Sequence, residues 1–177
     1  MIALKHRGSR SMNKRDFLKT TTTTTILAYL SYYLPGREKP VMATEKEHQF
    51  PIEKTEQQWK ETLSSEEFNV LRKHGTERAG TSPLDKEHRN GTFLCAGCQS
   101  ALFSSETKFD SGTGWPSFNA SLEGSVETTI DKSLFMSRVE VHCSHCGGHL
   151  GHVFNDGPKP TGKRYCMNGI ALKFVPS

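Results

Sequence analysis

Two Cys-x-x-C motifs constrain the fold of this chain more than any other feature. Cys95 and Cys98 form the first motif, and Cys143 and Cys146 form the second. A spacer of two residues lets one tight turn direct both sulfurs at a single ion. The two motifs together predict a closed tetrahedral thiolate site. Because 44 residues separate Cys98 from Cys143, we expect the motifs on separate hairpins that a sheet brings together.

The same four cysteines permit two other interpretations. An exported protein can pair them as two disulfides, and a rubredoxin-like iron site also uses four thiolates. Paired motifs in a strand-rich chain favour a metal, and zinc is preferred to iron. A closed four-sulfur site leaves no open position for a substrate, so one structural Zn²⁺ per chain is predicted, which stabilises the fold.

Length and composition favour one ordinary domain. The chain has 177 residues, a mean hydropathy of -0.59 and 24% charged residues, which exclude a multi-span membrane protein. Its 16 aromatic residues argue against a disordered chain. The net charge of +4 is too small to indicate nucleic-acid binding. Residues 1–43 contain eight basic and two acidic residues, so the net charge of the rest of the chain is -2.

Residues 1–43 are predicted to be an export signal. A basic stretch and six threonines precede a nine-residue apolar run at 26–34, and 41–43 offers small residues to a signal peptidase. Nine residues are too few to span a bilayer as a helix. The basic pair is similar to a twin-arginine signal with Lys14 in place of the first Arg, which favours a periplasmic protein. A short uncleaved anchor and a disordered tail on a cytoplasmic protein are the alternatives, and Met12 is a possible start.

The remainder of the chain divides into a polar linker at 44–54 and a body at 55–177. Two capping boxes, Thr55 with Gln58 and Ser64 with Glu67, predict two short helices, and Gly75 is expected to cap the second. Short runs rich in β-formers follow, separated by turn residues. These candidate strands are 93–94, 101–103, 126–130, 134–141, 150–154 and 170–175. The body is therefore predicted to be mainly β and antiparallel.

Cys166 is left over after the four metal ligands are counted. A lone Cys in a strand is often a buried small hydrophobe. Lys163 and Arg164 precede it, and cations next to a thiol favour the reactive thiolate. Asn168 follows two residues later, so it would share a strand face with Cys166 and can donate to an oxyanion. Cys166 is therefore predicted to be a reactive thiol.

Two further segments offer groups for a pocket around Cys166. Four thiolates saturate a tetrahedral ion, which leaves His149 and His152 free for proton chemistry. In a strand over 150–154, His152 and Phe154 share a face and are expected to line a pocket with Cys166. Trp115 lies among glycines, which favours a partly exposed ring at the wall of an apolar pocket, with a core Trp as the alternative.

Taken together, these residues resemble the B-type peptide-methionine sulfoxide reductases, which repair oxidised methionine. The resemblance covers about residues 55–174. It rests on residues 75–77, both Cys-x-x-C motifs, 109–118, 148–154 and 164–168. It implies a fold of two antiparallel sheets (β-tent, Mss4-like) with short N-terminal helices and a structural zinc, and reduction of the R epimer of methionine sulfoxide in proteins.

The resemblance also implies roles for individual residues. Cys166 would be the nucleophile that attacks the sulfoxide sulfur and becomes a sulfenic acid. Arg164 would favour the thiolate. His149, His152 and Asn168 would position and protonate the oxygen, and Asp156 would orient an imidazole. Trp115 and Phe154 would receive the substrate methyl group.

One departure from the family affects how Cys166 is regenerated. Many members carry a resolving Cys where this chain has Thr113, and Gly169 replaces a common Ser. The resemblance therefore predicts reduction of the sulfenic acid by an external thiol, thioredoxin, glutaredoxin or glutathione, or recruitment of a metal-motif cysteine. A monomer that acts on oxidised proteins is expected. A non-catalytic zinc-ribbon interaction module and an iron electron carrier are the alternatives.

Overall fold

Two short helices open the part of the chain that the computed structural model describes, residues 49–132 and 137–177. They are α3 (Glu56–Thr62) and α4 (Ser65–Lys73), and both predicted capping boxes are confirmed. The prediction for the end of α4 is wrong, because His74 rather than Gly75 adopts the left-handed conformation, with φ 55°. Gly75 is required for space, since a Cβ there would lie 2.9 Å from the carbonyl oxygen of Asn69. The predicted export segment lies outside the described residues.

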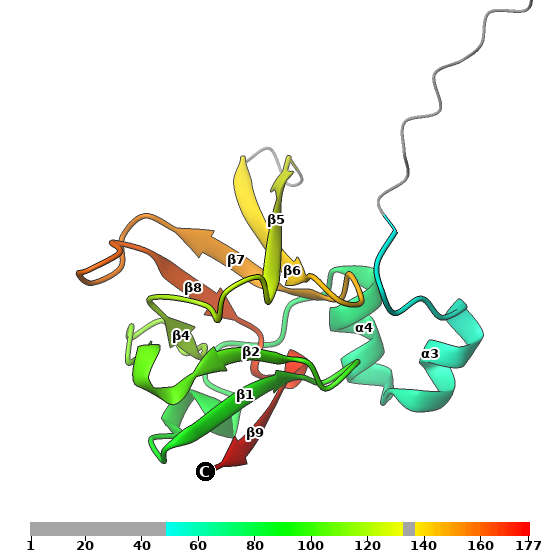
Figure 1. Ribbon diagram of the computed structural model, residues 1–177, viewed down its shortest axis with the longest axis horizontal. Helices are drawn as coiled ribbons and strands as arrows, with labels where there is room; N and C mark the ends of the chain where they lie inside the picture. Colours follow the sequence, from blue (N-terminus) through cyan, green and yellow to red (C-terminus); the bar gives the residue numbers. More distant parts are fainter. Residues whose placement is uncertain (1–48, 133–136) are drawn as a thin grey trace, which may run out of the picture. The chain divides into compact units, whose positions relative to one another are not determined.

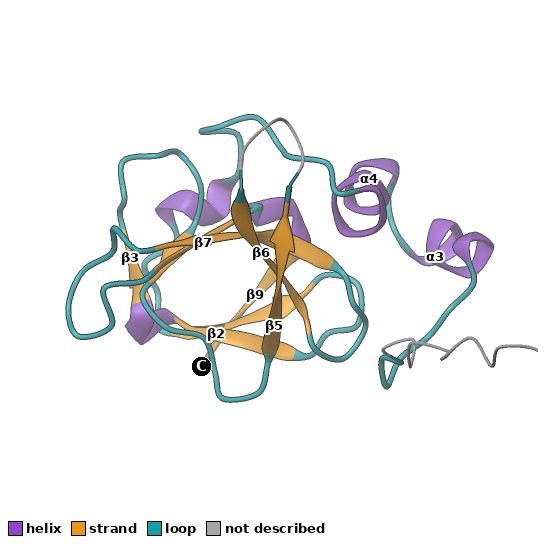
Figure 2. Cartoon of the chain, turned by 90° about the horizontal axis from the view of Figure 1, so that it is seen from above, coloured by secondary structure: helices purple, strands orange, loops and turns teal. Residues whose placement is uncertain are grey.

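Two antiparallel sheets make up the rest of the body (Figures 1 and 2). The three-stranded sheet has the order β2 (Ala101–Ser104), β1 (Gly91–Cys95), β9 (Leu172–Pro176), and the six-stranded sheet has the order β3 (Lys108–Phe109), β4 (Ser117–Phe118), β8 (Arg164–Met167), β7 (His149–Phe154), β6 (Arg138–Cys143), β5 (Val126–Asp131). The described residues also contain the 3₁₀ turns η1 (Pro83–Lys86), η2 (Ser105–Thr107) and η4 (Gly169–Ala171). The predicted fold class, mainly β with two antiparallel sheets and short N-terminal helices, is confirmed. No described helix is long and apolar enough to cross a membrane.

Every candidate strand overlaps an observed one, but two strands begin later than expected. The strand expected from residue 170 begins at Leu172, because Glu77 accepts hydrogen bonds from the amides of Gly169 and Ile170 and holds them in η4. The strand expected over 134–141 begins at Arg138, and 133–136 lie outside the described residues. Sequence patterning missed β3, β4 and β8, which are only two to four residues long.

Stacked aromatic rings join the two sheets. Phe118 of β4 packs on Phe103 of β2 with ring centroids 4.3 Å apart, and on Phe93 of β1 at 4.9 Å. All three side chains are fully buried. Burying one such ring stabilises a fold by about 1.5–3 kcal/mol. This core sets the relative position of β1, which ends at Cys95, and of the larger sheet, which carries Cys166.

The second half of the predicted linker packs against the second Cys-x-x-C motif. The Ile52 amide donates to the His145 carbonyl at 2.7 Å, and the Phe50 ring meets the His142 ring edge-on at 5.7 Å. Gly147 has φ +65°, and a Cβ there would collide with the Phe50 ring. Residues 49–54 contain neither helix nor strand, yet they are held in place.

Candidate metal and catalytic sites

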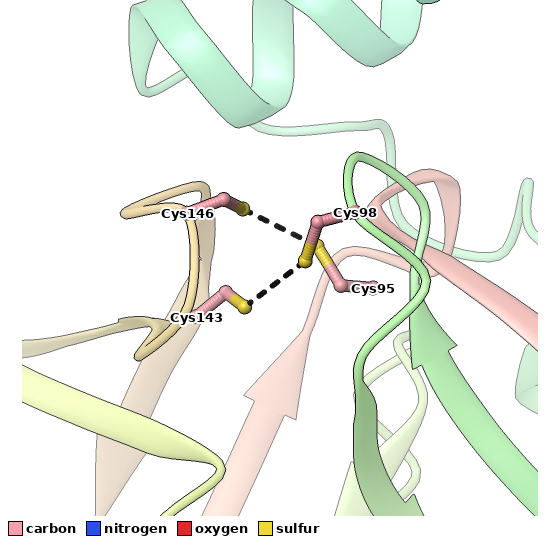
Figure 3. Close-up of side chains that lie close together, drawn as sticks. All are labelled: Cys95, Cys98, Cys143 and Cys146. Carbon is pink, nitrogen blue, oxygen red and sulfur yellow. Dashed lines mark hydrogen bonds between the residues drawn. The ribbon is translucent and has the colours of Figure 1, made fainter. Parts of the chain in front are cut away.

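The four motif cysteines converge on one point from two separate hairpins (Figure 3). The sulfurs of Cys95 and Cys146 lie 3.8 Å apart, and those of Cys98 and Cys143 lie 3.6 Å apart. A disulfide requires about 2 Å between sulfurs, so these cysteines are not paired covalently. Four sulfurs about 2.3 Å from a tetrahedral zinc would be about 3.8 Å apart. The donor set and its dimensions therefore fit a tetrahedral metal ion.

The surroundings of this cluster are suited to holding an ion. The four thiols compete for the same protons. Hydrogen bonds from Cys143 and the other thiols lower the pKa of Cys98, whereas hydrogen bonds with Cys143 and the others raise the pKa of Cys95. A divalent cation would remove this competition for protons and allow four thiolates. Leu71 of α4 covers the cluster, since Cβ atoms at Gly97 and Gly148 would lie 3.6 Å and 3.0 Å from it. The site is therefore enclosed by helix α4 and both motifs.

Cys166 lies in the middle of β8, where strand pairing places it between two neighbours. It pairs with Ser117 of β4 on one side and with His152 of β7 on the other. Beside it is a pocket of about 180 Å³. The lining residues are Thr76, Trp115, Arg138, Gly151, His152, Phe154, Cys166 and Asn168. The predicted pocket shared by Cys166, His152 and Phe154 is confirmed.

Arg164 is two residues from Cys166 in β8 and points to the same side of the sheet. Its guanidinium donates two hydrogen bonds to Asp156, at 2.9 and 2.8 Å, and lies 4.4 Å over the Phe154 ring. The Asp156 carboxylate, and after it the Cys166 thiol, raise the pKa of Arg164. The expectation that Asp156 orients an imidazole is wrong, because Asp156 binds Arg164 instead. Lys163 points to Asn155, at 2.6 Å.

The carboxylates that do meet the imidazoles come from β5 and β6, which sequence reasoning had left out of the site. His152 Nε2 lies 2.9 Å from an Asp131 oxygen that also accepts from Arg138 at 2.7 Å. Burial lowers the pKa of His152, and the Asp131 hydrogen bond opposes this shift. The available signal was the alternation of polar and apolar residues along β6. The pairing of β5 with β6 then places Asp131 opposite Arg138.

His149 lies behind the pocket rather than in its lining. Its side chain is 2% exposed, and Nδ1 lies 2.6 Å from an oxygen of Glu140. Nε2 has no hydrogen-bond partner among the described residues. Burial opposes ionisation of Glu140, but the hydrogen bond from His149 and the charges of His149 and His74 hold its pKa at about 2. The His149 ring contacts the His152 ring edge-on, with centroids 5.5 Å apart.

A β-bulge brings the two imidazoles together. Residues three apart on a regular strand point to opposite faces. In β7, His149 pairs with His142 and Gly151 pairs with Val141, so Leu150 is an extra residue. Leu150 is fully buried in the core, while His149 and His152 both face the carboxylates of the β5–β6 hairpin.

Asn168 is held rigidly at the edge of the pocket. Its side-chain oxygen accepts from the Glu77 amide at 3.0 Å, and its Nδ2 donates to the Leu150 carbonyl at 3.1 Å. It follows the end of β8 and directly precedes η4, so it is not part of the strand, but it lines the same pocket as Cys166, as expected. An amide nitrogen has two hydrogens, and the second is available to a ligand in the pocket that Asn168 lines.

The Trp115 loop forms another wall of the pocket. Gly112 and Gly114 have φ +70° and +86°, a conformation that favours glycine. The indole Nε1 donates to the Glu77 carbonyl at 3.2 Å. The ring is half-buried, as predicted for a pocket wall rather than for a core residue.

Thr113 of the same loop contacts the thiol directly. Its Oγ1 lies 3.8 Å from the sulfur of Cys166 and 2.8 Å from the hydroxyl of Ser111. Ser111 in turn contacts the hydroxyl of Ser117 at 2.7 Å. A chain of hydroxyl groups therefore runs from Cys166 along the underside of the Trp115 loop.

Comparison with known proteins identifies the family. A sequence model of the SelR domain matches residues 63–176. The chain belongs to the SelR domain family. Peptide methionine sulfoxide reductase MsrB of Leptospira interrogans is 51% identical over 126 residues, which cover 71% of this chain and 96% of that protein. MsrB of Thiobacillus denitrificans is 52% identical over 124 residues, 70% and 94% of the two chains.

A plant relative aligns over a larger part of this chain. The chloroplastic peptide methionine sulfoxide reductase B1 of Arabidopsis thaliana is 47% identical over 149 residues, 81% of this chain and 74% of that protein. The solved Mis18 'Yippee-like' domain aligns with 50% of this chain at 19% identity and a TM-score of 0.42, which is too distant to add to the assignment.

The SelR match contains both Cys-x-x-C motifs and every residue of the Cys166 pocket. Phe50 and α3 precede the match. Both cysteine sites therefore lie within the residues that match the SelR model. The segment with Phe50, which packs on Gly147, lies outside that match.

Proposed function

We propose that this SelR-family protein reduces the R epimer of methionine sulfoxide in oxidised proteins to methionine, with Cys166 as the nucleophile. The observation that carries the proposal is the pocket in which Cys166 faces His152, beside Trp115 and Asn168. A half-buried indole suits a methyl thioether group, and the polar groups opposite it suit a sulfoxide oxygen. The MsrB relatives support the reductase activity itself.

The reaction consumes one proton, and the Cys166 thiolate supplies two electrons. Cys166 sulfur forms a bond to the sulfoxide sulfur as the sulfoxide oxygen is protonated. The protonated oxygen then passes to the Cys166 sulfur, and the S–O and S–S bonds at the substrate sulfur break, so that methionine and a Cys166 sulfenic acid result. The substrate sulfur is reduced by two electrons, and the Cys166 sulfur is oxidised by two. His152 supplies the proton, while Asp131 holds its ring toward Cys166 and Asn168 donates to the oxygen. Arg164, held by Asp156 and Phe154, favours the thiolate.

An external thiol completes the cycle in our proposal. Thr113 occupies the position that contacts Cys166, and a hydroxyl group cannot form a disulfide with it. A first external thiol attacks the sulfenic acid, forms a mixed disulfide with Cys166 and releases water. A second thiol then attacks this mixed disulfide, which regenerates the Cys166 thiol and releases a disulfide of the two external thiols. Thioredoxin, glutaredoxin and glutathione are the reductants to compare.

The four-cysteine cluster holds one structural Zn²⁺ in this proposal. Cys95, Cys98, Cys143 and Cys146 would supply four thiolates, which leave no position for a substrate. The ion joins the ends of β1 and β6 and supplies no chemistry to Cys166. Metal analysis should find one zinc per chain in a colourless protein, and the visible absorption of thiolate-bound iron would contradict zinc.

Export to the periplasm is proposed for the segment before the domain. The basic stretch with Lys14, the apolar run at 26–34 and the small residues at 41–43 support it. An N-terminus near Thr44 on the protein isolated from cells is expected. A cytoplasmic protein that retains residues 12–43 would contradict cleavage and export.

Turnover of the separate epimers tests the proposed reaction. Wild type and Cys166→Ser are given the R or the S sulfoxide of a methionine peptide with dithiothreitol, and methionine is measured. Wild type should reduce the R epimer, and Cys166→Ser should lose at least about 10³-fold in rate. Equal rates for the two proteins would favour the non-catalytic zinc-ribbon module, and a preference for the S epimer would also contradict the proposal. Light scattering of the same preparations tests the predicted monomer.

A further inference from the structure

Three groups that ligate metals meet at His149, outside the lining of the Cys166 pocket. They are His74 at the end of α4, Glu140 in β6 and His149 in β7. His74 Nδ1 lies 2.9 Å and His149 Nδ1 lies 2.6 Å from the same Glu140 oxygen. One ligand atom from each residue lies within 4.8 Å of the others. The three ligand atoms are thus close enough to reach one ion, which would replace the two contacts between the imidazoles and Glu140.

The donor set is that of a zinc-class cation. Two imidazole nitrogens with one carboxylate oxygen recur in zinc sites and in other sites of borderline metals. Calcium and magnesium favour oxygen ligands instead. Thr129 donates to the second Glu140 oxygen at 3.1 Å, which leaves the first oxygen directed at the two imidazoles. A neighbour of this kind orients a ligating carboxylate.

The cluster is accessible from solvent. His74 is 65% exposed, and Glu140 lines an open pocket of about 360 Å³ together with His142 and Phe50. Water can therefore fill the remaining coordination positions, and an ion can enter without unfolding of the domain. This distinguishes the cluster from the four cysteines, which α4 covers.

The affinity should be lower than that of the four-cysteine site. Coordination displaces the Nδ1 protons now shared with Glu140. A ligating imidazole normally donates its other N–H to a partner, and His149 Nε2 has none among the described residues. Loss of such support lowers metal affinity about 10- to 100-fold. Binding is therefore reversible.

We propose that His74, Glu140 and His149 bind one divalent cation of the zinc class, Zn²⁺, Co²⁺, Ni²⁺ or Cu²⁺, separately from the four cysteines. The binding does not depend on the proposed reductase reaction. Its effect on that reaction does, because His149 contacts His152 in the Cys166 pocket. An ion at this cluster would withdraw His149 Nδ1 from Glu140 and alter the surroundings of His152.

The test uses the full protein without a polyhistidine tag, with its cysteine site loaded with zinc. Calorimetry with Zn²⁺ should show one further ion bound per chain. Absorption with Co²⁺ should show bands of nitrogen and oxygen ligands without thiolate charge transfer. His74→Asn removes the imidazole, and Asn tolerates the left-handed conformation at that position. It should weaken the second site at least about 10-fold.

A matched substitution and a second variant keep the test decisive. His88→Asn changes an exposed histidine outside the cluster and should leave binding unchanged. Glu140→Gln should weaken the second ion as His74→Asn does. No second ion in wild type, equal binding by His74→Asn and His88→Asn, or cobalt with thiolate charge transfer would each overturn the proposal. Failure of reductase activity would leave these binding results unaffected.

Discussion

The four-cysteine cluster and the Cys166 pocket use the same side chain in opposite surroundings. Cys95, Cys98, Cys143 and Cys146 lie at turns, face one another, and are covered by α4. Cys166 lies within a strand and faces an imidazole, a hydroxyl and an open pocket. A thiol among thiols is suited to hold a cation, whereas a thiol beside a guanidinium and imidazoles is suited to react. The neighbours, and not the cysteine, decide the role.

The largest effect should come from breaking the cluster. Cys143→Ser leaves three thiolates, and structural zinc contributes about 10 kcal/mol or more to folding in peptide models. We expect loss of the metal and a large fall in thermal stability, measured by metal analysis and circular dichroism. Cys166→Ser is the matched substitution and should keep the metal and the melting temperature. Equal melting temperatures for Cys143→Ser and Cys166→Ser would show that the two cysteine sites do not differ in their contribution to stability.

A smaller effect should come from the carboxylate behind His152. Asp131→Asn removes the carboxylate whose hydrogen bond and negative charge oppose the lowered pKa of His152, so this pKa should fall further. The proton-donating imidazolium is lost as pH rises through this pKa, so the high-pH limb of kcat should move to lower pH. Activity at neutral pH should fall about 10- to 100-fold, within the usual worth of acid catalysis.

Asp156→Asn is the control for that experiment. Asp156 contacts Arg164 and, within the described part of the chain, no imidazole, so the high-pH limb should stay in place. A shift of the limb with Asp156→Asn and none with Asp131→Asn would restore the role that sequence reasoning assigned to Asp156.

Thr113→Cys tests whether the reactive site differs from a self-resolving one by a single residue. Thr113 Oγ1 is 3.8 Å from Cys166 sulfur, so an introduced thiol lies within reach of the sulfenic acid. One turnover without reductant should then produce a disulfide, seen as two lost thiols by mass spectrometry. Wild type should instead retain a sulfenic acid that a trapping reagent labels.

Ser111→Cys serves as the comparison for the introduced thiol. Ser111 contacts Thr113 and Ser117 rather than Cys166, so no disulfide with Cys166 is expected. Disulfide formation by Ser111→Cys but not by Thr113→Cys would contradict the assignment of the contact.

The smallest effect concerns coupling between the proposed second ion and the pocket. Added Zn²⁺ should slow single-turnover formation of methionine by wild type about five-fold, in the usual range of coupling between sites. A single turnover avoids thiol reductants, which bind zinc. His74→Asn should be insensitive to the added ion, and equal slowing of both proteins would place the effect at Cys166 itself.

Much of this molecule was predictable because its signals are local. A capping box involves four adjacent residues, so Thr55 and Ser64 marked both helix starts correctly. Alternating β-formers located most strands. The two Cys-x-x-C motifs indicated a metal site because their spacing is a property of a single turn.

The missed residues depend on contacts between distant segments. His149 and His152 share a face only because of the bulge at Leu150, which strand periodicity does not reveal. Asp131 and Glu140 reach the imidazoles through the pairing of β5, β6 and β7. Asp156 was assigned to an imidazole by resemblance, but the turn between β7 and β8 places it against Arg164.

The sequence by itself determined which cysteines form turns, where the helices begin, and that Cys166 stands apart from the other four. Those properties follow from residue types at short spacing, which act through local backbone geometry. Only the tertiary structure decided which carboxylate serves which imidazole, that Thr113 contacts Cys166, and that His74 joins Glu140 and His149. Strand register and a single extra residue set these contacts, and the sheet aligns residues that are far apart in the chain.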